Sequence, residues 1–301
     1  MSKKNLLLIF ACLLCLFSTT SCKRISTKNE AKKEVILASF TVLADIIENV
    51  AKDEFIVRSI TKPGEEVHGY QPTPSDLIKA SEAFVFVDNG FGFELWAEKF
   101  ISNFQFKRIT ISDDLDPIFI KEDFYKGKPN PHAWISPKRG MLYVDIVVES
   151  LSELRPSKKE LFEMNGKIYK NKIAKIDEDF SMFINNLDKD KLYLVSCEGA
   201  FSYLTKDYGL KEVYLWPVNA ESQITPKRMA RTISLVKNKN VPAVFCESTV
   251  SNEAQMVVVN ETGAKFGGNL YVDSLSNDNG PASSYLGMLR YNFNLIKVGL
   301  N

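Results

Sequence analysis

Residues 157–187 read SKKELFEMNGKIYKNKIAKIDEDFSMFINNL, and this stretch decides how the chain is organised. Apolar side chains recur in it at helical spacing, at Leu161, Met164, Ile168, Ile173, Ile176, Phe180 and Phe183. Ser157 and Glu160 form a capping-box pattern after Pro156. The pattern predicts one helix of ~45 Å, at 1.5 Å per residue, with Gly166 as its one weak point. Such a helix would be a stiff spine between the segments on either side.

Strand-like and helix-like segments alternate on both sides of this spine. Before it, strand patterns lie at 34–40, 55–60, 83–90 and 106–112, with helix patterns at 42–51, 75–83 and 93–104. After it, strand patterns lie at 191–197, 212–216, 243–248 and 269–275, with helix patterns at 199–209, 226–238 and 252–263. Three helix starts carry a hydroxyl residue before a proline, at Thr73-Pro74, Ser136-Pro137 and Thr225-Pro226.

Alternation of strands and helices predicts parallel sheets covered by helices. We therefore expect an α/β fold of two lobes, each a mostly parallel sheet flanked by helices, joined by one long backbone helix. The expected bounds are 34–156 for the N-terminal lobe, 157–187 for the linking helix and 188–301 for the C-terminal lobe.

The composition is that of an ordinary globular protein, with 45% apolar and 25% charged residues among 301. The 38 Lys and Arg residues are balanced by 37 Asp and Glu residues. Nucleic-acid binding is therefore not expected, because it needs a basic patch. Five cysteines are too few for a disulfide scaffold of this length.

The N-terminus carries an export signal. Two lysines precede the apolar run Leu6 to Phe17, which fits a signal peptide and is short for a membrane span. Ser21 stands directly before Cys22, and this pair resembles a bacterial lipobox. We expect residues 1–21 to be a signal peptide, Cys22 to be lipidated and residues 22–33 to be a polar tether. A cleaved signal without a lipid is the alternative.

Cys197 and Cys246 end two predicted strands of the C-terminal lobe. A disulfide between them is conceivable in an exported protein. The interpretation that we favour is two buried thiols that act as small apolar side chains. Strand alternation should also point Cys197 away from the face that carries Glu198, so thiol ligation of a metal is not expected.

The chain has two histidines, His68 and His132, and both lie in loops before predicted helices of the N-terminal lobe. Carboxylates take similar places in the C-terminal lobe, where Glu198 and Glu247 end strands and Asp273 lies within or just past one. Ligand groups gather at the carboxyl ends of parallel strands. Each residue alone is more often structural. Together, two imidazoles that face two or three carboxylates predict a divalent-cation site between the lobes.

These motifs together resemble those of the metal-binding substrate-binding lipoproteins of bacterial ABC importers, a family that takes manganese, zinc or iron. The matching stretches follow the family order over about residues 33–298: HGYQPTPSD, NPHAWISP, SCEGAFSYLTKDYGL, WPVNAESQITP, FCES and YVDSLSNDNGPASSYLGMLRYN. The resemblance implies a fold like that of periplasmic binding proteins, of the helical-backbone metal-receptor type. It also implies that the chain is not an enzyme.

The resemblance assigns four metal ligands, which are His68, His132, Glu198 and Asp273, and it gives Glu247 a supporting place beside them. Zinc-type members carry a histidine where Glu198 stands and often a His-rich loop, and this chain has neither. Two neutral imidazoles and two carboxylates balance a divalent charge and suit Mn²⁺ or Fe²⁺. We predict one divalent ion as cargo, with manganese first and then iron or zinc.

The resemblance further implies an exported monomer, lipid-anchored to the bacterial cell membrane or periplasmic. It would deliver its ion to the permease and ATPase subunits of a metal importer. Protonation of the two histidines is expected to release the ion at acid pH. Two alternatives come from other classes. One is a surface adhesin, and the other is a mononuclear metallohydrolase, although no HExxH motif is present.

Overall fold

The computed structural model describes residues 33–122, 125–189, 192–218 and 224–301. The predicted signal peptide, Cys22 and all but the last residue of the predicted tether lie outside the described residues. Residues 34–301 form one unit. Within the described ranges, no helix combines the length and the apolar character that a membrane span requires.

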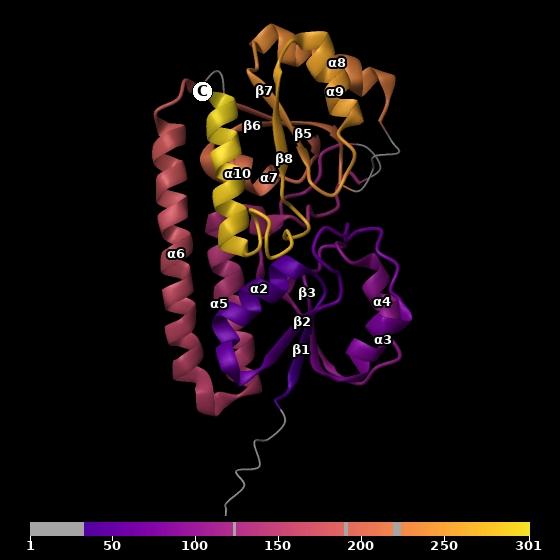
Figure 1. Cartoon of the computed structure of the whole chain (residues 1–301), viewed down its shortest axis with the longest axis vertical. Helices are drawn as coiled ribbons and strands as arrows, with labels where there is room; N and C mark the ends of the chain where they lie inside the picture. Colours follow the sequence, from indigo (N-terminus) through magenta and orange to yellow (C-terminus); the bar gives the residue numbers. More distant parts are fainter. Residues whose placement is uncertain (1–32, 123–124, 190–191, 219–223) are drawn as a thin grey trace, which may run out of the picture. The chain divides into compact units, whose positions relative to one another are not determined.

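The N-terminal lobe is built on a four-stranded parallel sheet with the strand order β2-β1-β3-β4. Its strands are β1 (Val35–Ala38), β2 (Ile56–Ser59), β3 (Ala83–Asp88) and β4 (Lys107–Thr110). Alternate residues of β1 face opposite layers, as strand geometry requires. Ile36 packs with α2 (Thr41–Ala51) and α5 (Pro137–Leu154). Leu37 packs with α3 (Pro74–Ser81) and α4 (Leu95–Ile101) on the other face (Figure 1).

The C-terminal lobe contains two parallel strand pairs. One pair is β5 (Tyr193–Glu198) with β6 (Lys211–Trp216), and the other is β7 (Ala243–Glu247) with β8 (Lys265–Leu270). The helices of this lobe are α7 (Ser202–Tyr208), α8 (Pro226–Lys239) and α9 (Glu253–Thr262). The Gln255 side chain of α9 donates to the carbonyl oxygens of Val195 and Phe245, at 3.4 and 2.7 Å. One buried amide therefore links β5 to β7.

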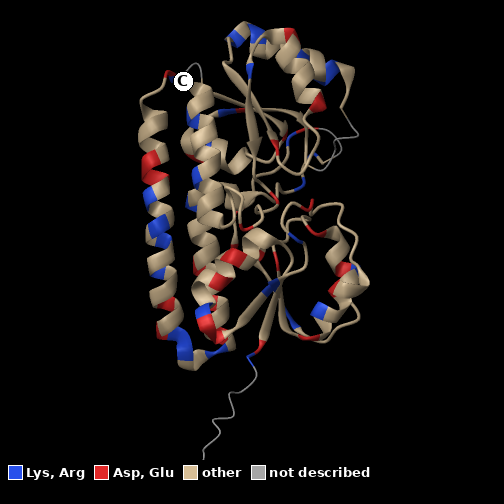
Figure 2. Cartoon of the chain, in the orientation of Figure 1, with Lys and Arg blue, Asp and Glu red and all other residues tan. Residues whose placement is uncertain are grey.

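The predicted spine is α6 (Lys159–Asn185), which runs beside α5 and α10 (Tyr285–Leu300) in Figure 1. Four lysines, from Lys167 to Lys175, lie in the middle of the helix and are followed by three acidic residues, Asp177 to Asp179 (Figure 2). Its inner face buries Phe162, Tyr169, Ile173, Ile176, Phe180 and Ile184. The predicted capping box is wrong, because Pro156 opens a short 3₁₀ turn (Pro156–Lys158) and no side chain caps α6. The helix α10 was not assigned from the sequence.

The three pairs of a Thr or Ser followed by a proline do begin helices, as predicted. Thr73, Ser136 and Thr225 are the N-cap residues of α3, α5 and α8, each followed by proline. Thr73 takes part in a capping box with Asp76. The Ser136 hydroxyl instead donates to Asp207 at 2.6 Å, which joins the start of α5 to the C-terminal lobe.

The last strand differs from the prediction, because β8 covers Lys265–Leu270 rather than 269–275. Two adjacent glycines, Gly267 and Gly268, lie within this strand. The strand needs them, since a Cβ on Gly267 would overlap the Phe245 ring, and Gly268 has φ +112° at the point where the pairing shifts. Asp273 therefore lies three residues beyond the end of β8, and not within it.

Gly166 is the point of close approach between α5 and α6. A Cβ at this position would overlap the Val148 side chain of α5. The glycine that seemed to weaken the helix therefore allows it to pack.

We predict that Gly166→Ala lowers the free energy of unfolding by about 1–3 kcal/mol, because overpacking outweighs the better helix propensity of alanine. Urea denaturation measures the effect. The control is Lys167→Ala at the exposed neighbouring position, which should change stability by less than about 0.5 kcal/mol. A stabilised Gly166→Ala protein would contradict the packing argument.

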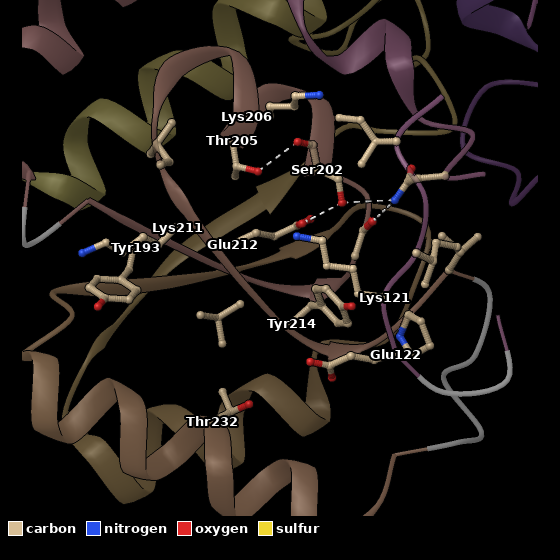
Figure 3. A pocket seen from close by; sticks show the side chains of 18 of the residues that line it. Lys121, Glu122, Tyr193, Ser202, Thr205, Lys206, Lys211, Glu212, Tyr214 and Thr232 are labelled. Carbon is tan, nitrogen blue, oxygen red and sulfur yellow. Dashed lines mark hydrogen bonds between the residues drawn. The ribbon is translucent and has the colours of Figure 1, made fainter. Parts of the chain in front are cut away.

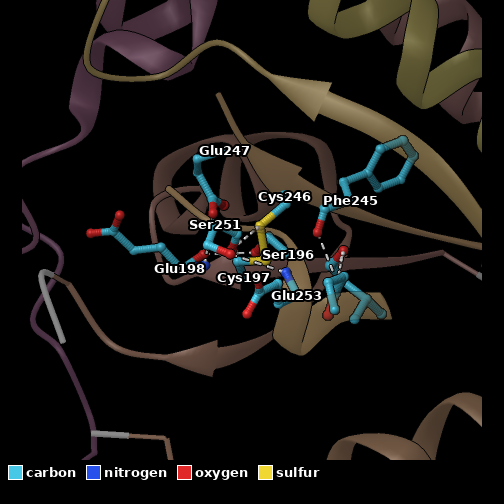
Figure 4. The surroundings of a disulfide bond; sticks show 10 residues. Ser196, Cys197, Glu198, Phe245, Cys246, Glu247, Ser251 and Glu253 are labelled. Atoms are coloured by element: carbon cyan, nitrogen blue, oxygen red, sulfur yellow. Dashed lines mark hydrogen bonds between the residues drawn. A yellow bond between two sulfur atoms is a disulfide. The ribbon is translucent and has the colours of Figure 1, made fainter. Parts of the chain in front are cut away.

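Cys197 and Cys246 form a disulfide, so the favoured interpretation of two free thiols is wrong. Their Cα atoms lie 4.8 Å apart, because β5 and β7 bring the two strand ends side by side. Figure 4 shows that each cysteine directly precedes an acidic residue, Glu198 on β5 and Glu247 on β7. The sulfurs are therefore not available as metal ligands.

The disulfide closes a chain segment with a sequence separation of 49 residues. Loop-closure entropy gives such a cross-link about 4 kcal/mol of stabilisation. We expect Cys197→Ala/Cys246→Ala to lose about 2–4 kcal/mol in urea denaturation. A reductant should destabilise the wild type toward the level of the double variant and leave the double variant unchanged. Equal stability of both proteins without reductant would refute the prediction.

Candidate metal centre

The structure brings together His68, His132, Glu198 and Asp273, the four residues that the sequence predicted as ligands. Each lies in a segment beyond a strand or at its carboxyl end, as a site in an α/β sheet requires. All four are buried. One possible ligand atom from each lies within 4.8 Å of all the others, so the group could hold a metal ion.

The separations within this group suit a single ion. The Nε2 atom of His68 lies 3.7 Å from Glu198 Oε1 and 3.9 Å from Asp273 Oδ2. The Nε2 atom of His132 lies 3.9 Å from Glu198 Oε1 and 3.5 Å from Asp273 Oδ1. Ligand atoms about 2.1 Å from an ion, at tetrahedral angles, lie about 3.4 Å apart. Small inward shifts would therefore complete the coordination.

The two imidazoles are oriented toward each other. Their Nε2 atoms are 3.2 Å apart. The Nδ1 atom of His132 lies 3.0 Å from the Asn130 side-chain oxygen, and His68 forms a hydrogen bond with the Phe93 backbone. Since each ring uses its other side for these bonds, the Nε2 lone pairs converge on one point. A cation at that point relieves their repulsion.

One oxygen of Asp273 is also open to coordination. The buried Oδ1 atom of Asp273 has no hydrogen-bond partner in the described part of the chain. Burial of such an oxygen without a partner is costly. A bound divalent ion would offset that cost, so the donor set fits a metal.

Hydrogen bonds join the ligand-bearing segments of the two lobes. The Trp134 indole N–H donates to the Val272 carbonyl at 3.0 Å, which ties the His132 segment to the Asp273 segment. The Leu275 N–H donates to the Thr41 hydroxyl at 2.9 Å. Because one contact lies on each side of Asp273, the Asp273 loop is held against the N-terminal lobe.

Glu247 lies beside the four-residue group without belonging to it. Its Oε2 atom accepts the Glu198 backbone N–H at 3.1 Å. Its Oε1 atom is buried and has no hydrogen-bond partner among the described residues. Burial raises the pKa of Glu247 well above its ordinary value, and the neighbouring Glu198 adds to this effect. Glu247 therefore holds the backbone at Glu198.

Burial changes the expected order of titration at the site. It lowers the pKa of His132 to about 3, and it lowers the pKa of His68 well below its ordinary value. Burial raises the pKa of Asp273 well above its ordinary value, with a further contribution from Glu66. The expectation that both histidines titrate first is therefore wrong for His132, because burial lowers the pKa of this imidazole below the ordinary Asp value and raises the pKa of Asp273 above it.

Sequence reasoning missed three residues that surround the ligands. Asn130 accepts the His132 ring N–H, and the Phe93 ring packs edge-on to His68 with a centroid distance of 4.6 Å. Glu66 accepts the His68 backbone N–H at 2.6 Å. Only Asn130 had a local signal, since it stands two positions before His132 in NPHAW.

Comparisons with known proteins agree along nearly the whole chain. The family model described as ZnuA, zinc-uptake complex component A, periplasmic, matches residues 36–299. The iron-binding protein YfeA of Yersinia pestis is 39% identical over 285 residues, which cover 94% of this chain and 92% of YfeA. The manganese ABC transporter substrate-binding lipoprotein PsaA of Streptococcus anginosus is 30% identical over 305 residues, covering 99% and 98%.

A solved structure extends this agreement to the fold. The Mn-bound periplasmic metal-binding protein from Candidatus Liberibacter asiaticus matches with a TM-score of 0.84 at 36% identity. The match covers 89% of this chain and 100% of that chain.

The fold and the buried donor set define a two-lobed solute-binding protein with a divalent-metal site. The chain belongs to the ZnuA family, and it is a metal-binding, substrate-binding protein of an ABC importer. The predicted family and fold class are confirmed. Its relatives include lipoproteins and periplasmic proteins. Because this is a family of transport binding proteins, the chain is not an enzyme, and the metallohydrolase alternative does not hold.

The raised pKa of Asp273 predicts that metal binding releases protons. In the metal-free site the Asp273 carboxyl keeps its proton at pH values above the ordinary pKa of an aspartate, whereas a bound ion needs the ionised carboxylate. Affinity should therefore rise with pH above about 4, the ordinary Asp value, until Asp273 is ionised in the free protein. Calorimetry in buffers of different ionisation enthalpy measures the protons released.

The control for this titration is Asp278→Asn, at an exposed position five residues away, which should release the same number of protons. Zero proton release at pH 6, together with affinity that falls only near pH 3, would show that the histidines govern the pH dependence instead.

Proposed function

We propose that the cargo is Mn²⁺, held by His68, His132, Glu198 and Asp273, with Fe²⁺ or Zn²⁺ as second choices. The observation that carries the proposal is the buried set of two neutral imidazoles and two carboxylates. Two anionic oxygen donors balance the charge of a divalent ion and favour harder cations than a three-histidine site does. Among the similar proteins, YfeA is named for iron and PsaA for manganese, and the matching family model is described by zinc uptake.

The proposed capture couples the two lobes. His68 and His132 belong to the N-terminal lobe, whereas Glu198 and Asp273 belong to the C-terminal lobe. An ion that binds all four ligands depends on the distance between the lobes, so binding favours their closed arrangement. The continuous helix α6 and the hydrogen bonds around Asp273 limit the opening to a small tilt or a loop movement.

Export and delivery complete the proposal. Residues 1–21 would be removed as a signal peptide, Cys22 would carry the lipid, and residues 22–33 would be a tether to the membrane surface. The folded part would comprise an N-terminal lobe at 34–156, a linking helix at 157–187 and a C-terminal lobe at 188–301. The loaded monomer would deliver its ion to a membrane permease driven by ATPase subunits.

Elemental analysis tests the ligand set. The protein without residues 1–22 is purified with Mn²⁺ in zinc-poor buffer, beside His68→Ala, Asp273→Ala and the exposed control Asp278→Ala. We expect about one manganese per chain in the wild type and in the control. Both ligand variants should lose it, since each leaves an incomplete and unbalanced site.

Equal manganese in all four proteins would refute the ligand assignment. Metal-free wild type under these conditions would refute manganese as cargo, and repetition with Fe²⁺ and Zn²⁺ would then identify the ion. Circular dichroism of each variant shows whether a loss of metal reflects a loss of fold.

A further inference from the structure

The buried side chain of Asn130 makes hydrogen bonds in both lobes. Its oxygen accepts the backbone N–H and the ring Nδ1–H of His132, both at 3.0 Å. Its nitrogen donates to the Gly199 carbonyl at 2.6 Å and to the Ser202 hydroxyl at 3.3 Å. Gly199 directly follows Glu198. One amide therefore lies between the segments that bring a ligand from each lobe.

The C-terminal lobe determines which way this amide points. A carbonyl oxygen only accepts, so the Gly199 carbonyl must face the NH₂ group of Asn130. The Ser202 hydroxyl donates its proton to Glu212 at 2.6 Å (Figure 3). Because that proton is already committed, the hydroxyl oxygen faces Asn130 as an acceptor. Glu212 is held in turn by the Phe201 N–H, at 3.1 Å.

The amide orientation then determines the tautomer of His132. With its NH₂ group directed to Gly199, Asn130 presents only its oxygen to the imidazole. The Nδ1 atom must therefore carry the ring proton, which leaves the Nε2 lone pair directed at His68, Glu198 and Asp273. The opposite tautomer would place the Nδ1 lone pair against the Asn130 oxygen.

We propose that Asn130 is a positioning residue that holds His132 in its Nδ1–H tautomer and links the direction of its Nε2 atom to the Glu198 segment of the other lobe. The proposal rests on the proposed function. Loss of such a partner of a ligating histidine lowers metal affinity about 10–100-fold. If Asn130 only held the loop in place, its substitution would leave the tautomer of His132 unchanged.

Nitrogen-15 NMR of the metal-free protein without residues 1–22 reports the tautomer of His132 directly. With two histidines in the sequence, ¹⁵N-histidine labelling gives two imidazole patterns, and His68→Ala assigns them. Three proteins are compared with the wild type. Asn130→Leu removes both ends of the amide, and Asn130→Asp keeps the acceptor for Nδ1–H. The matched control, Asn165→Leu, removes a part-buried asparagine that binds the Val50 carbonyl.

We expect the Nδ1–H tautomer of His132 in the wild type, in Asn130→Asp and in Asn165→Leu. Asn130→Leu should show the Nε2–H tautomer and bind Mn²⁺ about 10–100-fold more weakly. An unchanged tautomer in a folded Asn130→Leu protein would overturn the proposal, even if affinity fell. If Asn130→Leu does not fold, the Nε2–H tautomer in the wild type or in Asn130→Asp would overturn it.

A separate measurement distinguishes this failure from failure of the proposed function. If the wild type binds one manganese and His132→Ala binds none, the ligand set stands whatever the tautomer of the Asn130 variants. If His132→Ala keeps its manganese, the ligand set itself is wrong.

Discussion

Two carboxylates and two neutral imidazoles lie together in one buried place, and the rest of the structure depends on this constraint. Burial alone makes this cluster costly, because the Asp273 Oδ1 atom has no hydrogen-bond partner among the described residues and the Nε2 atoms of two imidazoles lie only 3.2 Å apart. A divalent cation reverses the balance. The loops after the strands, the contacts between the lobes and the surrounding aromatic rings all serve to hold these four groups before the ion arrives.

The scaffold holds the cluster from several directions. The helix α6 packs on α5 and α10, and the Trp134 indole and the Thr41 hydroxyl hold the Asp273 loop on both sides. In the C-terminal lobe, the disulfide and the Glu247 carboxylate fix the end of β5, where Glu198 is attached. These contacts thus hold the segments that carry Glu198 and Asp273 in the C-terminal lobe.

The sequence predicted the elements whose signals are local. A Thr or Ser before a proline predicted three helix starts. The histidines in loops and the acids at or near strand ends predicted the cluster. The failures depended on tertiary contacts. Glycine is needed in β8 because a Cβ on Gly267 would overlap the Phe245 ring. The disulfide forms because the ends of β5 and β7 lie side by side. The order of titration was misjudged because burial, which shifts His132 and Asp273 in opposite directions, is not visible in sequence.

The disulfide also makes one side of the cluster depend on the redox conditions around the chain. Cys197 and Cys246 stand immediately before Glu198 and Glu247, so the cross-link fastens the strand ends that shape one side of the cluster. Disulfides form and persist in oxidising compartments, whereas the same cysteines stay reduced in the bacterial cytosol. In a reducing compartment the two strand ends would therefore lack this cross-link, and the Glu198 side of the cluster would have to be held without it.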